Sequence, residues 1–193
     1  MKGQPGSVVE FLVKKVNTSD TLKVKVRREL IHLPDIKYAG MIAPKTGYIL
    51  QTGFTEGVAD TMRVKVNQLK AQGMEKLILD LRGNGGGLLK EAVEIVSIFV
   101  PENSLVVTSR DRDGKDVEVY RTQKAPLAEK MKLVVLVDGG SASSSEIVSG
   151  ALQDLDRATI MGTRTFGKGL VQSVRPLPFG GQLKLTVAKY YTP

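Results

Sequence analysis

A serine stands at the turn between two expected elements. Ser143 follows the apolar run Leu133 to Val137 and a stretch of small residues, and apolar residues at helical spacing come after it. Glu146, three positions later, completes the spacing of a helix capping box. One interpretation is that Ser143 only caps a helix. The other is that a serine at the positive end of a helix dipole acts as a nucleophile.

A nucleophilic serine needs a base, and the chain offers few. Its one histidine, His32, lies in an apolar segment where a partly exposed strand residue is the expected identity. Lys168 stands between two glycines, which is typical of a solvated loop lysine. Lysine is nevertheless the remaining common base for serine, and we expect apolar strands around Lys168 to bury it and keep its amine neutral.

The glycine run from Gly83 to Gly87 contains four glycines in five positions. It is not a Walker A loop, because no Gly-Lys-Ser/Thr follows, and Leu88 stands where a dinucleotide-binding loop would have its third glycine. A tight turn is one interpretation. The number of glycines favours another, a loop at a helix start that points backbone N–H groups at an anion or oxyanion.

The elements around these residues alternate in type. Apolar spacing predicts helices over 56–72 and 88–100, and apolar runs predict strands over 47–51, 76–82, 133–137 and 157–161. Further strands are expected over 104–110 and 116–121, and a C-terminal hairpin over 170–175 and 182–191. Residues 8–16 and 22–26 read as an N-terminal hairpin, and residues 30–44, with two prolines, as a connector. This order predicts a layered α/β fold.

Composition narrows the class of protein. The 193 residues, 41% hydrophobic and 25% charged, suit a soluble protein with one core and a small appendage. The net charge of +8 is dispersed; only 23–28 is dense in basic residues, and there valines alternate with them, so we expect no nucleic-acid binding. One histidine and no cysteine exclude disulfides and every metal site except an all-carboxylate one. Residues 1–30 show neither a transmembrane run nor a signal sequence.

Three motifs together resemble one protein family. Asp80–Gly87, Ser141–Ile147 and Phe166–Gln172, in this order and at these separations, are similar to motifs of the C-terminal processing peptidases, also called tail-specific proteases. The resemblance runs from Gly40 to Pro193. It implies a crotonase-like α/β core and a serine endopeptidase that cleaves extended C-terminal segments of proteins with a Ser–Lys dyad.

The resemblance also implies roles for individual residues. Ser143 matches the nucleophile, Lys168 the general base, and Gln172 the residue that orients the lysine. The oxyanion hole would combine the backbone N–H of Ser144 with that of one glycine among Gly85, Gly86 and Gly87. Position 144 is serine where many relatives have alanine, which leaves a backbone donor unchanged.

Family members carry a PDZ domain upstream of the core, so we expect residues 1–29 to be the C-terminal remnant of one. Residues 30–193 would then be the peptidase core, truncated at its C-terminal end. The expected partners are protein or peptide substrates, without cofactor, metal or nucleic acid; homo-oligomerisation stays open. The resemblance implies a periplasmic or cell-envelope location.

Two other functions remain. A catalytically silent, peptide-binding relative of the same fold is favoured if Lys168 points to solvent. A phosphate-binding α/β domain would rest on the glycine run alone.

Overall fold

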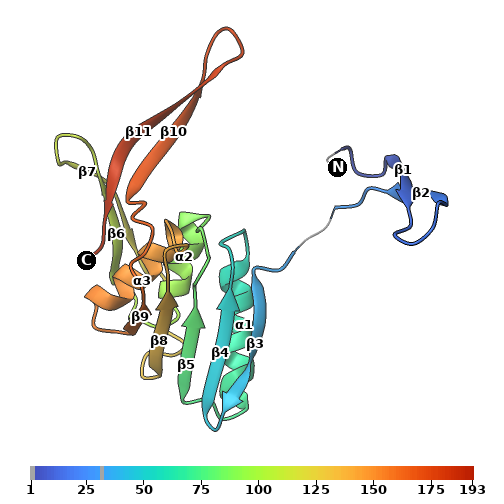
Figure 1. The fold of residues 1–193 in the computed structure, drawn as a ribbon. Coiled ribbons are helices and arrows are strands. Elements are labelled where there is room, and N and C mark those ends of the chain that lie inside the picture. Colours follow the sequence, from blue (N-terminus) through green and yellow to red (C-terminus); the bar gives the residue numbers. More distant parts are fainter. Residues whose placement is uncertain (1–2, 31–32) are drawn as a thin grey trace. The chain divides into compact units, whose positions relative to one another are not determined.

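The computed structural model describes residues 3–30 and 33–193 and divides the chain into two compact units, residues 1–34 and 35–193. The histidine of the sequence, His32, lies outside the described residues. Figure 1 shows the elements of both units.

The first unit contains one antiparallel hairpin, β1 (Val8–Lys14) and β2 (Thr21–Arg27). The predicted N-terminal hairpin is therefore confirmed. Its apolar side chains are mostly open to solvent; Leu12, for example, is 67% exposed. Two strands alone cannot bury a core, which explains this exposure.

The second unit is built on a five-stranded sheet in the order β3-β4-β5-β8-β9. Strands β4, β5, β8 and β9 are parallel neighbours, and β3 pairs antiparallel to β4 at one edge. The strands are β3 (Ile36–Ala43), β4 (Thr46–Gln51), β5 (Lys76–Asp80), β8 (Lys132–Val137) and β9 (Thr159–Gly162).

The prediction of a connector over residues 30–44 was wrong, because β3 occupies most of it. The two prolines that suggested a connector, Pro34 and Pro44, lie just outside the strand on either side. Proline is tolerated at these places because no ladder hydrogen bond is lost there.

Helices α1 (Val58–Ala71), α2 (Leu89–Val96) and α3 (Ser144–Asp154) lie on one side of this sheet (Figure 1). In β8, Leu133, Val135 and Val137 are buried, whereas the residues between them are half-buried, as expected of a strand covered on one face. The apolar face predicted for the first helix is confirmed, since its residues are buried: Val58, Met62, Val66 and Leu69.

Helix α2 is shorter than predicted. The sequence pattern placed its end near Pro101, but the helix ends at Val96. Beyond it, Ile98 and Phe99 donate their backbone N–H groups three residues back, at 3.1 and 2.9 Å, so the chain tightens into turns. Both side chains are fully buried, which explains why the apolar pattern continues past the helix.

A second, antiparallel sheet has the order β10-β11-β6-β7. Its strands are β6 (Leu105–Arg110), β7 (Asp116–Arg121), β10 (Leu170–Pro176) and β11 (Gln182–Tyr191). The predicted C-terminal hairpin, β10–β11, is confirmed, and it extends away from the rest of its unit (Figure 1).

This topology brings the motif residues to one edge of the parallel sheet. The glycine run follows β5, the serine turn follows β8, and the lysine loop follows β9. Because these strands are parallel, their carboxyl ends meet at the same edge, which is where open α/β sheets bind ligands. Among the described residues no helix is both long and apolar enough to cross a membrane.

Candidate active site

Ser143 caps the N-terminus of α3 in an unusual backbone conformation. Its φ and ψ are 55° and −113°, whereas N-cap residues ordinarily adopt extended values. A non-glycine residue in such a sparsely populated region costs about 1–3 kcal/mol, and strain of this kind concentrates at functional sites. The conformation therefore favours a function for Ser143 beyond capping.

Ser144 is the first residue of α3, and its two hydrogen-bonding groups behave differently. Its hydroxyl donates to the backbone oxygen of Gly87 at 2.9 Å, which ties the serine turn to the glycine run. Its backbone N–H has no hydrogen-bond acceptor among the described residues. A free N–H at a helix start, one residue after Ser143, is suited to receive a developing negative charge.

Asn84 holds the glycine run against the serine turn. Its backbone oxygen accepts the N–H of Ala142 at 3.0 Å and the hydroxyl of Ser145 at 2.8 Å. Its side chain is fully buried and donates to the backbone oxygen of Gln51 at 3.0 Å. Sequence reasoning missed Asn84, although it is the one side chain larger than hydrogen within the run.

The three candidate glycines differ in their surroundings. Gly86 is packed against the serine turn, where a Cβ would lie 2.6 Å from the Ala142 oxygen and 2.9 Å from the Ser144 nitrogen. Its N–H is already engaged, at 2.9 Å, by Oδ1 of Asn84. Within the described chain the N–H groups of Gly85 and Gly87 have no acceptor. The two free donors are therefore those on either side of Gly86.

Lys168 lies in the loop between β9 and β10 and is exposed, contrary to the expectation that apolar strands bury it. Ser143 and Lys168 line the same pocket, whose volume is about 240 Å³. The pocket is lined by Ser143, Glu146, Ile147, Gly167, Lys168, Gly169, Tyr190 and Thr192. No hydrogen bond joins the side chains of Ser143 and Lys168, both of which belong to the described residues.

Gln172 lies on β10 and its side chain is exposed. It is not among the residues that line the pocket, and within the described residues its side chain makes no hydrogen bond. The structure thus brings Ser143 and Lys168 to one pocket and leaves Gln172 outside it.

Glu146 connects the serine turn to the lysine loop. Its Oε2 accepts the backbone N–H of Ser143 at 2.8 Å and that of Lys168 at 2.9 Å. Its Oε1 accepts the hydroxyl of Thr165 at 2.9 Å and the N–H of Gly167 at 2.6 Å. The sequence predicted only the capping contact to Ser143. The other three contacts come from a loop that no sequence pattern connects to this helix.

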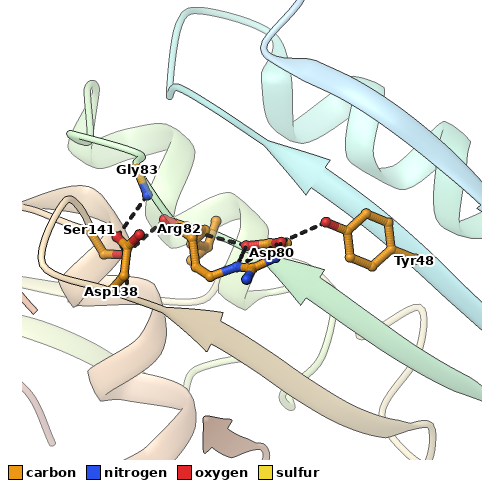
Figure 2. A network of polar contacts seen from close by, with 7 residues as sticks. Tyr48, Asp80, Arg82, Gly83, Asp138 and Ser141 are labelled. Atoms are coloured by element: carbon orange, nitrogen blue, oxygen red, sulfur yellow. Dashed lines mark hydrogen bonds and ion pairs between the residues drawn. The ribbon is translucent and has the colours of Figure 1, made fainter. Parts of the chain in front are cut away.

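Asp138 joins the glycine run to the serine turn, as Figure 2 shows. Its Oδ1 accepts the N–H of Gly83 at 2.8 Å and the N–H of Gly140 at 2.9 Å, and it lies 3.4 Å from the Ser141 hydroxyl. The two backbone donors hold the pKa of this carboxyl below its usual value. Asp138 therefore stays ionised and keeps both loops in place at neutral pH.

A second network lies beside it, at the end of β5 (Figure 2). The Arg82 guanidinium donates to both oxygens of the buried Asp80 carboxylate, and the Tyr48 hydroxyl donates to Oδ2 at 2.6 Å. Desolvation raises the pKa of Asp80, but the hydrogen bonds from Arg82 and Tyr48 outweigh it and hold the pKa low. Desolvation and the neighbouring carboxylate raise the pKa of Tyr48.

None of these carboxylates forms a metal-binding cluster. Across residues 3–30 and 33–193, no group of three or more His, Cys, Asp and Glu side chains lies close enough to hold a metal ion.

Comparison with known proteins gives consistent matches. The model of "Peptidase family S41" matches residues 45–193. A carboxyl-terminal-processing protease of Picosynechococcus sp. is 41% identical over 195 residues, which cover 100% of this chain and 46% of that protein. The chloroplastic carboxyl-terminal-processing peptidase 3 of Arabidopsis thaliana is 37% identical over 205 residues, covering 100% of this chain and 39% of that protein.

Among solved structures, the photosystem II D1 C-terminal processing protease is similar in its mixed α/β fold. Its TM-score is 0.73 at 31% sequence identity, and the match covers 98% of this chain and 52% of that chain. The present chain spans less than half the length of the two curated relatives named above.

Proposed function

This chain belongs to peptidase family S41, and on that premise we propose that it is the core of a serine endopeptidase that cleaves protein substrates near their C-termini. The observation that carries the proposal is the pocket that Ser143 and Lys168 share. The strained conformation of Ser143 and the free N–H of Ser144 support the same role.

In the proposed reaction, Lys168 Nζ takes the proton of the Ser143 hydroxyl as Oγ attacks the scissile carbonyl carbon. The oxygen of the resulting tetrahedral intermediate accepts hydrogen bonds from the Ser144 N–H and a glycine N–H. Lys168 then returns the proton to the leaving amine, and an acyl-enzyme remains on Ser143. Water, deprotonated by the same amine, hydrolyses this ester.

For the glycine donor we favour Gly87 over Gly85 and Gly86. The Gly86 N–H is held by Asn84, and a Cβ on Gly85 would meet open space, so Gly85 does not pack against the serine turn. The backbone oxygen of Gly87 already accepts the Ser144 hydroxyl, so Gly87 lies next to the residue that supplies the other proposed donor.

Because Lys168 is exposed, the proposed mechanism requires that the bound substrate shield its amine from water. A lysine amine acts as a base only where its charged form is disfavoured, and water stabilises the charged form. We infer that a bound polypeptide covers Lys168 and excludes water from the pocket. Gln172 would then turn its side-chain oxygen toward the amine and orient it without adding a negative charge.

The finer architecture is also a proposal. We infer a crotonase-like arrangement of the α/β core, with residues 1–29 as the end of a PDZ domain. A periplasmic or cell-envelope location is inferred from the family; the Arabidopsis relative is named as chloroplastic. Protein or peptide substrates follow from the peptidase family, and extended C-terminal segments are the proposed recognition element.

The same exposure favours a second candidate, a catalytically silent relative that binds peptides without cleaving them. In that case Lys168 is a solvated loop lysine and Ser143 only caps α3. The two candidates give opposite results with substrate.

Hydrolysis of an unfolded protein such as casein separates them. We expect slow cleavage by the unaltered chain and none by Ser143→Ala or Lys168→Ala, which lack the nucleophile or the base. Lys168→Arg should also be inactive, because guanidinium remains protonated. Circular dichroism of each variant shows whether the fold is kept. Equal cleavage by the lysine variants, or binding without cleavage by the unaltered chain, would refute the dyad.

A further inference from the structure

Strand β10 forms one edge of the antiparallel sheet, and its outer side pairs with no other strand of the described chain. It begins at Leu170, directly after Lys168 and Gly169, which both line the pocket. An open strand edge next to a proposed peptidase pocket is a surface on which an extended polypeptide can form main-chain hydrogen bonds.

The two ends of the hairpin establish which backbone groups of β10 face outward. The Tyr190 N–H donates to the Gly169 oxygen at 2.9 Å, and near the tip the Leu177 N–H donates to the Gly181 oxygen at 2.8 Å. Odd-numbered residues of this segment therefore bond toward β11 at both ends. In an antiparallel pair these residues alternate with residues whose N–H and C=O point away.

The register along the strand agrees with this alternation. Val171 is opposite Ala188 and Gln172 is opposite Thr186, so the irregularity leaves out Val187 of β11 and does not interrupt β10. Even-numbered residues of β10 thus present their backbone groups to the free edge. They are Leu170, Gln172 and Val174, and Pro176 ends the series because it has no N–H.

The free edge faces the catalytic side. The next even-numbered residue before Leu170 is Lys168, and its N–H donates to Glu146 at the start of α3. Glu146 also accepts the N–H of Ser143. The row of outward-facing backbone groups on β10 therefore continues toward the serine turn.

The edge also lacks the usual protection against pairing. Natural edge strands commonly carry lysine, proline or inward-pointing charges. From Leu170 to Val174 the sequence has no charged residue and no proline, and Leu170 and Val174 are 39% and 53% exposed. Protection begins only at Arg175 and Pro176, at the end distant from the pocket.

We propose that the substrate binds as an additional β-strand along β10, held by the backbone groups of Leu170, Gln172 and Val174, and that this strand leads the scissile bond to Ser143. The inference rests on the proposed peptidase function. It identifies the ligand as an extended, backbone-recognised polypeptide. It also supplies the cover that the exposed Lys168 requires.

The test is a methylation scan of a peptide ligand. A fluorescein-labelled peptide of alanine and valine residues is titrated against Ser143→Ala, and the amide nitrogens are then methylated one position at a time. We expect the affinity to fall at least about tenfold at every second position and to change little at the positions between, because only alternate N–H groups face β10. Uniform tolerance, losses at consecutive positions, or no binding of the unmethylated peptide would overturn the proposal.

A pair of variants at one residue tests the protein side. Val174→Pro removes an outward N–H and leaves the bonds to β11, whereas Val174→Ala keeps that N–H and serves as the control. We expect the proline variant alone to weaken peptide binding, by about five- to tenfold. Equal affinities would overturn the proposal. Peptide binding is measured on Ser143→Ala and does not depend on hydrolysis. If the unaltered chain cleaves no substrate but the methylation scan still alternates, the peptidase function is rejected and the added strand is not.

Discussion

Ser143 and Lys168 donate their backbone N–H groups to the same carboxylate oxygen, at 2.8 and 2.9 Å. That oxygen belongs to Glu146, whose other oxygen holds Thr165 and Gly167. A single side chain thus sets the distance between the main chains of the two proposed dyad residues. Its carboxylate forms no hydrogen bond with Ser143 Oγ or Lys168 Nζ, so it acts through the main chain, which makes Glu146 a positioning residue.

Substitution of Glu146 should therefore reduce catalysis more than stability. Glutamine has one accepting oxygen and would turn an NH₂ group toward backbone donors, so we expect Glu146→Gln to lower kcat by about 10²-fold with a much smaller change in KM. Thr165→Val, which removes one of the four contacts, should lower kcat only a few-fold. Steady-state kinetics on a peptide substrate measures both, and a Glu146→Gln enzyme with unaltered kcat would contradict the positioning role.

Asp138 allows a sharper comparison, because one of its oxygens makes all three side-chain contacts. Asparagine retains such an oxygen, whereas alanine does not. We expect Asp138→Asn to keep kcat within a few-fold and Asp138→Ala to lower it by about tenfold or more, because the glycine run and the serine turn lose their connection. If both variants lose activity equally, the charge and not the hydrogen bonds would be the important property.

The strained backbone at Ser143 predicts that a residue which tolerates positive φ at this position will stabilise the fold. Glycine adopts positive φ without a steric penalty, so Ser143→Gly should be more stable than Ser143→Ala by about 1 kcal/mol, and we expect both variants to be inactive. Urea denaturation of the two variants gives the difference in the free energy of unfolding. An alanine variant as stable as the glycine variant would show that the conformation is not strained.

Acid should destabilise the fold partly through Asp80. Its pKa lies below the usual value of an aspartate, so its contribution to stability is complete above about pH 4 and is lost as the pH falls through the lower, folded pKa. Asp80→Asn should reduce stability at pH 7 by about 1–3 kcal/mol and flatten the decline below pH 4. Asp113→Asn, in an exposed turn, is the control. Parallel pH profiles for Asp80→Asn and the unaltered chain would exclude this linkage.

Much of the fold could be predicted because its strands are local in sequence. The run from Leu77 to Leu81 and that from Leu133 to Val137 indicated buried parallel strands, and the glycines after the first one marked the turn. Strand β3 could not be recognised, because its flanking prolines suggested a connector. Its large apolar residues Tyr38 and Ile42 are exposed, so the strand does not have one buried and one polar face.

For the site, sequence supplied residue types but not their surroundings. The motifs led to Ser143 and Lys168, yet the exposure of Lys168 depends on which elements cover its loop, and that is a tertiary property. The contacts of Glu146 and Asp138 join backbone groups from separate loops. Backbone donors have no residue-specific pattern, so such contacts appear only when the loops are placed in space.

The central claim is that Lys168 activates Ser143, and covalent labelling tests it most directly. The chain is incubated with diisopropyl fluorophosphate, and the modified residue is located by mass spectrometry. The rate of labelling is measured for the unaltered chain, Lys168→Arg and Lys168→Ala. We expect one phosphorylated serine, Ser143, in the unaltered chain, and a rate lower by about 10²-fold or more in both variants. Labelling of Ser143 at an undiminished rate in either variant, or its absence from the unaltered chain, would contradict the claim.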